Sequence, residues 1–125
     1  SWQKVLSGQK TQTRRLARDS DRLWSIEHEG REAEKVLWRG EKAKWRTGRS
    51  YAVQPGRGKK AIARIRLLDI QYQLLGHVSE EEANAEGYAS LAEFIQTWTK
   101  IHGHYDLGQP VWALEFRLIP ERGRA

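Results

Sequence analysis

Apolar residues recur at intervals of three and four between residues 91 and 101, and this periodicity predicts a helix with one buried face. Ser90 and Glu93 form the Ser-x-x-Glu pattern that caps helix starts, and Gly103 supplies the stop. The residues of the apolar stripe are Leu91, Phe94, Ile95, Trp98 and Ile101.

Two shorter helices are predicted by the same kinds of signal. The Ser79 to Glu82 segment repeats the capping pattern, and its helix is expected to run to about Glu86 and stop at Gly87. Near the start of the chain, an apolar stripe at helical spacing precedes Gly8, which suits a helix C-terminus. That stripe consists of Trp2, Val5 and Leu6.

Strand patterns occupy most of the remaining chain. Residues 61–75 alternate apolar and polar, but the phase slips near Leu67 and Leu68, which predicts a β-bulge. Residues 111–119 and 51–54 are also predicted strands, the second after a turn at residues 45–49. Several strands with short helices predict a small α+β barrel.

The region between the first helix and residue 45 is harder to assign. Residues 18–25 contain Asp19, Ser20 and Asp21, which are typical of a capped loop. Residues 27–42 are highly charged and contain one short apolar strand at 36–38. We expect them to form an excursion from the barrel, such as a hairpin that spans Gly30 and Gly40. Residues 122–125 are expected to be a frayed tail.

Composition narrows the class of partner. The 125 residues suit one domain, and the net charge of +6 with a pI near 9.8 suits a polyanion such as RNA. Cysteine is absent, which excludes disulfides and thiol chemistry. No run is long enough for a membrane span, and the cytoplasm is the default location. The chain starts without Met inside a predicted helix, so we expect further residues to precede it.

Residues 6–15 combine a glycine, a lysine, two threonines and two arginines without any acid. The pattern Gly8-x-Lys10-x-x-x-x-Arg15 resembles the GxKxxxxR signature of the ASCH (activating signal cointegrator homology) domain. The resemblance continues at residues 51–59, 80–88 and 111–116, in the expected order. It implies one PUA-like β-barrel over residues 1–125, in a superfamily associated with RNA.

One branch of that family consists of small amidohydrolases that deacetylate N4-acetylcytidine with a lysine, a threonine and a glutamate. The resemblance assigns these catalytic roles to Lys10, Thr13 and Glu86. A lysine with a pKa lowered by desolvation could activate the threonine hydroxyl. Residues three apart face opposite sides of a regular strand, so Lys10 and Thr13 can cooperate only if the backbone between them turns. The alternative is a structural ion pair between Lys10 and Glu86.

A basic tract forms the second candidate site. Residues 42–68 contain nine Lys or Arg and no acid, with Trp45 and Tyr51 interleaved. Basic grooves with aromatic platforms bind single-stranded nucleic acid, whereas the alternative is a solvated face with both rings in the core. Arg14 and Arg15 are expected to point opposite ways, one toward a ligand and one toward the fold. The residues predicted to bind ligand or RNA are Gly8, Gln12, Arg15, Trp45, Tyr51, Gln54, Arg57, Lys59, Lys60 and Tyr105.

The predicted function is therefore binding of RNA or a modified nucleoside in a basic cleft between residues 8–15, the 54–60 loop and the Glu86 helix. The amidohydrolase, a single-stranded ribonuclease suggested by the family, and a protein-interaction module using tryptophans of residues 27–42 remain alternatives. His102 and His104 flank a glycine after a helix, an arrangement more typical of helix-dipole partners than of a zinc site. No metal or cofactor is expected.

Overall fold

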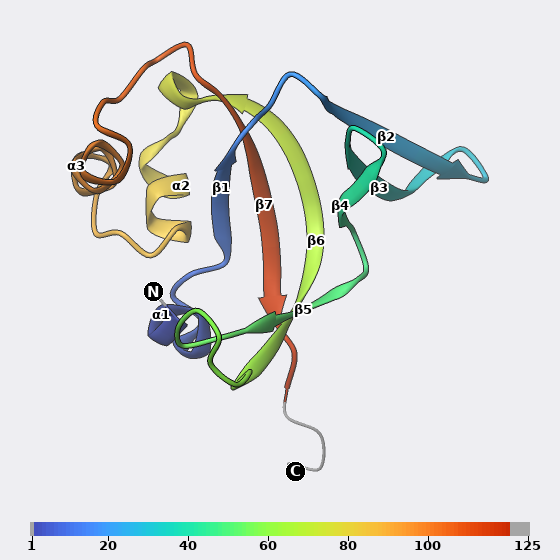
Figure 1. Ribbon diagram of the computed structural model, residues 1–125, viewed down its shortest axis with the longest axis horizontal. Coiled ribbons are helices and arrows are strands. Elements are labelled where there is room, and N and C mark those ends of the chain that lie inside the picture. The colour runs from blue at the N-terminus through green and yellow to red at the C-terminus, as the bar shows by residue number, and fades with distance from the viewer. Residues whose placement is uncertain (1, 121–125) are drawn as a thin grey trace.

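The computed structural model describes residues 2–120, so the predicted tail at 122–125 lies outside the described residues. The larger of two antiparallel sheets has the strand order β1-β7-β6-β5 and curls around part of a barrel (Figure 1). Its strands are β1 (Gln12–Leu16), β5 (Ser50–Val53), β6 (Ala63–Leu74) and β7 (Pro110–Leu118).

The smaller sheet and the helices lie on opposite sides of this curled sheet in Figure 1. The smaller sheet has the order β2-β3-β4. The sequence prediction of an α+β barrel with short flanking helices is confirmed. The remaining elements are β2 (Asp21–His28), β3 (Arg31–Arg39), β4 (Lys42–Arg46), α1 (Trp2–Ser7), the 3-10 turn η1 (Leu75–His77), α2 (Glu80–Ala85) and α3 (Leu91–His102).

Strand β7 separates two hydrophobic clusters. Successive residues of a strand face opposite sides, so Val111 packs under α2 and α3 while Trp112 packs toward the smaller sheet. The helix-side cluster includes Leu75, Val78, Ala83, Phe94, Trp98 and Val111. The other cluster includes Leu37, Leu67, Ile70, Trp112 and Leu114.

Local signals placed the helices correctly. The Ser79 hydroxyl accepts a hydrogen bond from the Glu82 N–H, and the Glu82 carboxylate accepts one from the Ser79 N–H. Gly87 and Gly103 adopt φ of 95° and 86° at the helix ends, a conformation that favours glycine. The predicted bulge is also confirmed, because the β6–β7 register shifts between Leu67 and Asp69.

The predicted loop at residues 18–25 is wrong. Strand β2 begins at Asp21, and residues 21–46 form a three-stranded antiparallel sheet. The expected hairpin is present, with one turn at Gly30 and a second at Gly40, but three strands form where one short strand was expected. Trp45, predicted in a turn, lies in β4. Local composition was misleading because the strands of this sheet contain few buried residues, namely Asp21, Val36 and Leu37.

Candidate functional site

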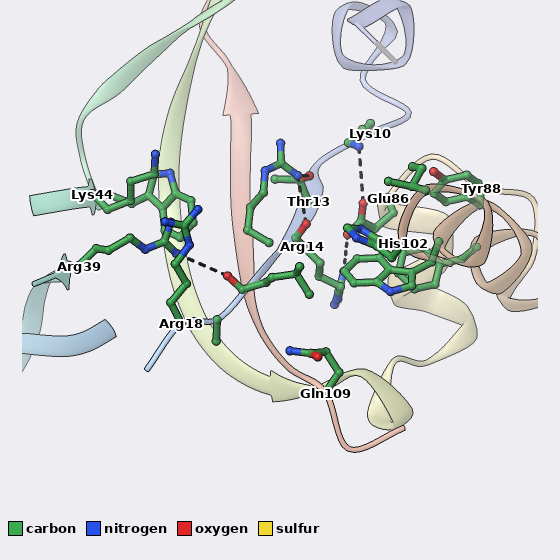
Figure 2. A pocket seen from close by; sticks show the side chains of 17 residues that line it. Lys10, Thr13, Arg14, Arg18, Arg39, Lys44, Glu86, Tyr88, His102 and Gln109 are labelled. Carbon is green, nitrogen blue, oxygen red and sulfur yellow. Dashed lines mark hydrogen bonds and ion pairs between the residues drawn. The ribbon is translucent and has the colours of Figure 1, made fainter. Parts of the chain in front are cut away.

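A cavity of about 720 Å³ lies between β1, the β3–β4 hairpin and α3 (Figure 2). Its volume falls within the roughly 300–1,000 Å³ typical of small-molecule sites. Aromatic rings from β4, the α2–α3 connection and α3 line it, together with many cations and one carboxylate. The charged lining residues are Lys10, Arg14, Arg15, Arg18, Arg39, Lys44 and Glu86.

Lys10 and Glu86 meet at the helix side of the cavity. The Lys10 ammonium lies 3.5 Å from Glu86 Oε1, and both side chains are largely buried. Burial lowers the pKa of Lys10 below its ordinary value, although the Glu86 carboxylate opposes this effect. The amine is therefore closer to losing its proton than a surface lysine would be.

Thr13 lines the same cavity as Lys10 because Lys10 lies before the strand. Strand β1 begins at Gln12, while the Lys10 N–H donates to the Lys4 carbonyl at 3.0 Å, at the end of α1. The alternation rule of a regular strand therefore does not separate the two side chains. Thr13 Oγ1 accepts a hydrogen bond from Arg15 Nη1 at 2.6 Å.

Arg14 is buried beneath this end of the cavity. Its Nη1 donates to Glu86 Oε2 at 3.2 Å, its Nη2 pairs with Glu82, and its Nε donates to Gln73 Oε1 at 2.9 Å. A single guanidinium thus fixes two carboxylates of one helical turn and links them to β6. Glu86 is consequently shared between Arg14 and Lys10.

The opposite end of the cavity is built around Asp21. Arg39 donates twice to this carboxylate, at 2.8 and 3.1 Å, and Trp112 Nε1 donates to it at 2.8 Å. Burial raises the pKa of Asp21, but the bonds from Arg39, the Arg18 N–H and Trp112 outweigh it and bring the pKa to about 2. The Arg39 guanidinium and the Lys44 ammonium both lie over the Trp45 ring, 5.4 and 5.7 Å from its centroid.

The structure brings only some of the predicted site residues to this cavity. Lys10, Thr13, Glu86, Arg15 and Trp45 line it. The other predicted ligand-binding residues do not line it, and they are Gly8, Gln12, Tyr51, Gln54, Arg57, Lys59, Lys60 and Tyr105.

Two of the predicted residues outside the cavity, Tyr105 and Tyr51, have clear structural contacts, and Gln12 lines a second cavity. The Tyr105 hydroxyl donates to the Leu75 carbonyl at 2.9 Å, and its ring packs on the helix-side core. Tyr51 accepts a bond from the Arg46 N–H and packs against the other cluster. Gln12 lines a separate acidic cavity of about 190 Å³, where its Oε1 has no hydrogen-bond partner among the described residues.

Sequence reasoning missed two residues of the cavity wall, Trp98 and His102, and the buried carboxylate of Asp21, which holds the lining residue Arg39. Asp21 was assigned to a loop, and its contact with Trp112 joins residues 91 positions apart in the chain. Trp98 and His102 were assigned to a core stripe and a helix end, yet both line the cavity, with ring centroids 4.2 Å apart. The apolar stripe of α3 was a usable signal, but it did not reveal that one edge of the stripe stays open.

Metal ligands and membrane spans were searched within residues 2–120. That part of the chain contains no group of three or more His, Cys, Asp or Glu residues arranged to hold a metal ion. None of its helices has the length and apolar character needed to cross a membrane.

Comparisons with known proteins identify the fold. The chain is similar to the solved ASCH domain from Lactobacillus crispatus JV V101, with a TM-score of 0.66 and 17% identity over 94% of this chain and 69% of that one. It is also similar to protein EF3133 from Enterococcus faecalis V583, described under the family model DUF984, with a TM-score of 0.54 and 19% identity over 94% of this chain and 66% of that one. No protein-family model and no curated protein matches the chain.

These two likenesses show that the chain has the fold of an ASCH domain. The chain spans about two thirds of the length of each solved relative.

Proposed function

We propose that this chain binds a nucleotide unit, either in single-stranded RNA or as a modified nucleoside, in the cavity between β1, β4 and α3. One observation carries the proposal: cations and aromatic rings from separate elements converge on a single cavity of ligand size. Cations bind phosphates, and aromatic faces stack on bases of any sequence. The ASCH fold and the net charge of +6 support the same conclusion.

Fluorescence anisotropy with a labelled single-stranded RNA of about eight nucleotides tests this proposal. Arg15→Ala is expected to weaken binding about tenfold, because it removes an exposed charge from the cavity wall. Arg31→Ala is the matched control, since Arg31 is equally cationic and exposed but lies outside the cavity. Binding must also weaken as salt rises, because phosphate contacts release counterions.

The absence of binding would refute the proposal, and so would an affinity that does not respond to salt. Equal losses in Arg15→Ala and Arg31→Ala would show that charge acts without a specific site. Integrity of the RNA after incubation with repurified protein tests the ribonuclease alternative in the same samples.

A second candidate function is the deacetylation of N4-acetylcytidine. It is favoured by the buried Lys10 amine, whose pKa is lowered, in the same cavity as Thr13 and Glu86. Neutral Lys10 would take the Thr13 hydroxyl proton as Thr13 Oγ attacks the acetyl carbonyl. The amide C–N bond would then break, with the proton passing to the departing cytidine amine. Water would hydrolyse the acyl ester to release acetate and restore Thr13.

Chromatographic detection of cytidine from N4-acetylcytidine tests this second candidate. Lys10→Ala and Thr13→Val are expected to abolish turnover. Lys59→Ala is the control and is expected to retain turnover, because Lys59 lies outside the cavity. No turnover by the unmodified protein, or equal turnover in Lys10→Ala, removes the hydrolase. That result would leave the binding proposal standing, because binding is measured independently.

A further inference from the structure

The two ends of the cavity differ in their charge balance. In Figure 2, Arg18, Arg39 and Lys44 lie on one side of β1, and Lys10, Glu86, Tyr88 and His102 lie on the other. The first group belongs to the β1–β2 connection and the β3–β4 hairpin, and we name it the β4 end. The second group belongs to the elements around α2 and α3, and we name it the helix end.

At the β4 end, the positive charges outnumber the negative ones. Asp21 is the carboxylate of this end, and it is occupied by Arg39. Within residues 2–120, neither Arg18 nor Lys44 has a carboxylate within the 4.0 Å that defines an ion pair, and both side chains are exposed. Two cations are therefore available here to a ligand, beside the Trp45 ring.

At the helix end, the paired charges are balanced and the polar groups are mixed. Lys10 and Arg14 face the carboxylates of Glu82 and Glu86, so two positive charges meet two negative ones. The exposed Arg15 adds a further positive charge near Lys10, but it is open to solvent, which screens it. Lys10 remains a donor and Glu86 an acceptor at the cavity wall, beside the rings of Tyr88, Phe94, Trp98 and His102. A phosphate dianion gains little binding free energy in such an environment. A flat ring with hydrogen-bond donors and acceptors on its edge is a better match for it.

We infer from this juxtaposition that the cavity orients its ligand, with the phosphate at Arg18 and Lys44 and the base at Lys10 and Glu86. The preferred ligand class is then a phosphorylated nucleoside rather than a free nucleoside. This inference rests on the proposed function, and it adds a direction and a requirement for phosphate that the proposed function lacks.

Isothermal titration of the full chain with the four common ribonucleosides and their 5′-monophosphates tests the inference. The monophosphate of the best-bound base is expected to bind about tenfold more tightly than its nucleoside, because charged hydrogen bonds to phosphate are added. Inorganic phosphate alone is expected to bind more weakly than the monophosphate, because it leaves the helix end unfilled.

Paired variants separate the two ends. Arg18→Gln with Lys44→Gln is expected to remove most of the advantage of the monophosphate while leaving nucleoside affinity within about twofold. Arg57→Gln with Lys59→Gln removes the same charge outside the cavity and is expected to change neither affinity. Because Arg18 and Lys44 are exposed, the variant should keep its fold, which circular dichroism checks.

The outcomes distinguish the inference from the proposal beneath it. Equal affinity for nucleoside and monophosphate, or an advantage that persists in the Arg18 and Lys44 variant, overturns the orientation and leaves nucleotide binding intact. Phosphate binding as tightly as the monophosphate also overturns it, because the base would then contribute nothing. If no nucleoside, monophosphate or RNA binds, the proposed function itself fails.

Discussion

The adjacent residues Arg14 and Arg15 have different roles in this fold. The Arg14 side chain is fully buried among Glu82, Glu86 and Gln73, whereas Arg15 is exposed and lines the cavity. Removing one partner of a buried ion pair leaves its counterion unpaired, which costs more than an exposed pair contributes. The stability of the fold is therefore expected to depend on Arg14 far more than on Arg15.

Arg14→Met is expected to lower the free energy of unfolding by about 3 kcal/mol or more, because Glu86 stays buried with only Lys10 as a partner. Arg15→Met, which deletes the same charge one residue later, is expected to cost less than about 1 kcal/mol. Urea denaturation of both variants measures the difference. Similar losses of unfolding free energy in the two variants would contradict this difference between Arg14 and Arg15.

Asp21 gives the fold a dependence on pH. Its pKa of about 2 lies below the ordinary value of 3.8, so its contribution is complete above about pH 5 and is lost as pH falls toward 2. The size of this contribution is roughly 2 kcal/mol. Asp21→Asn is expected to be less stable than the unmodified chain at pH 5, with a gap that closes toward pH 2. A gap that stays constant over this range would refute the assignment.

The candidate site was only partly predictable at the residue scale. The resemblance named Lys10, Thr13 and Glu86, and all three line one cavity. Nothing in the sequence pairs Asp21 with Arg39 or Trp112, because those contacts depend on how the smaller sheet packs. Alternation along a strand predicted that the Arg14 and Arg15 side chains point to opposite faces. It did not predict which residues each side chain contacts.

At the scale of elements, the smaller sheet is attached to the larger one mainly through β3. Leu37 has no exposed surface and belongs to the same cluster as Ile70 and Trp112. Lys35 adds a bond from its ammonium to the Ile70 carbonyl at 3.1 Å and a pair with Asp69 at 2.8 Å. The β4 end of the cavity therefore depends on these contacts of β3, together with the hydrogen bond from Trp112 to Asp21 of β2.

Leu37→Ala is expected to destabilise the protein by about 2–5 kcal/mol, because a fully buried leucine leaves a cavity. Trp24→Ala is the control from the neighbouring strand, since the Trp24 side chain is 63% exposed, and its cost should be below about 1 kcal/mol. Thermal unfolding of both variants measures the two losses of stability. A larger loss in Trp24→Ala would mean that the outer face of the sheet carries the packing.

Elements with local signals could be predicted, and those without them could not. Helices α2 and α3 begin at serine caps and end before glycines, so sequence neighbours determine their limits. Strand β2 has no such signal, because Asp19 and Ser20 precede it and most of its residues are exposed. Its structure comes from pairing with β3, whose position depends on the rest of the molecule.

At the scale of the whole molecule, the basic tract begins at the cavity and continues beyond it. Lys44 and Trp45 line the cavity, and the chain then runs through β5 to the 54–60 loop. That loop, predicted to bind RNA, does not line the cavity, and its Arg57, Lys59 and Lys60 are all exposed. A ligand confined to the cavity would not contact the loop, whereas a longer nucleic-acid strand could contact both.

The loop is therefore expected to matter only for oligonucleotides. Replacing its three basic residues by glutamine should leave mononucleotide affinity within about twofold and reduce the affinity for a single strand of about eight nucleotides. For single strands, each lost phosphate contact lowers the slope of log affinity against log salt by about 0.7. Titrations between about 50 and 300 mM salt measure this slope. Replacing Arg22, Arg31 and Lys100 by glutamine removes the same three charges at exposed positions outside the loop and the cavity lining. An unchanged slope in the loop variant would restrict recognition to the cavity.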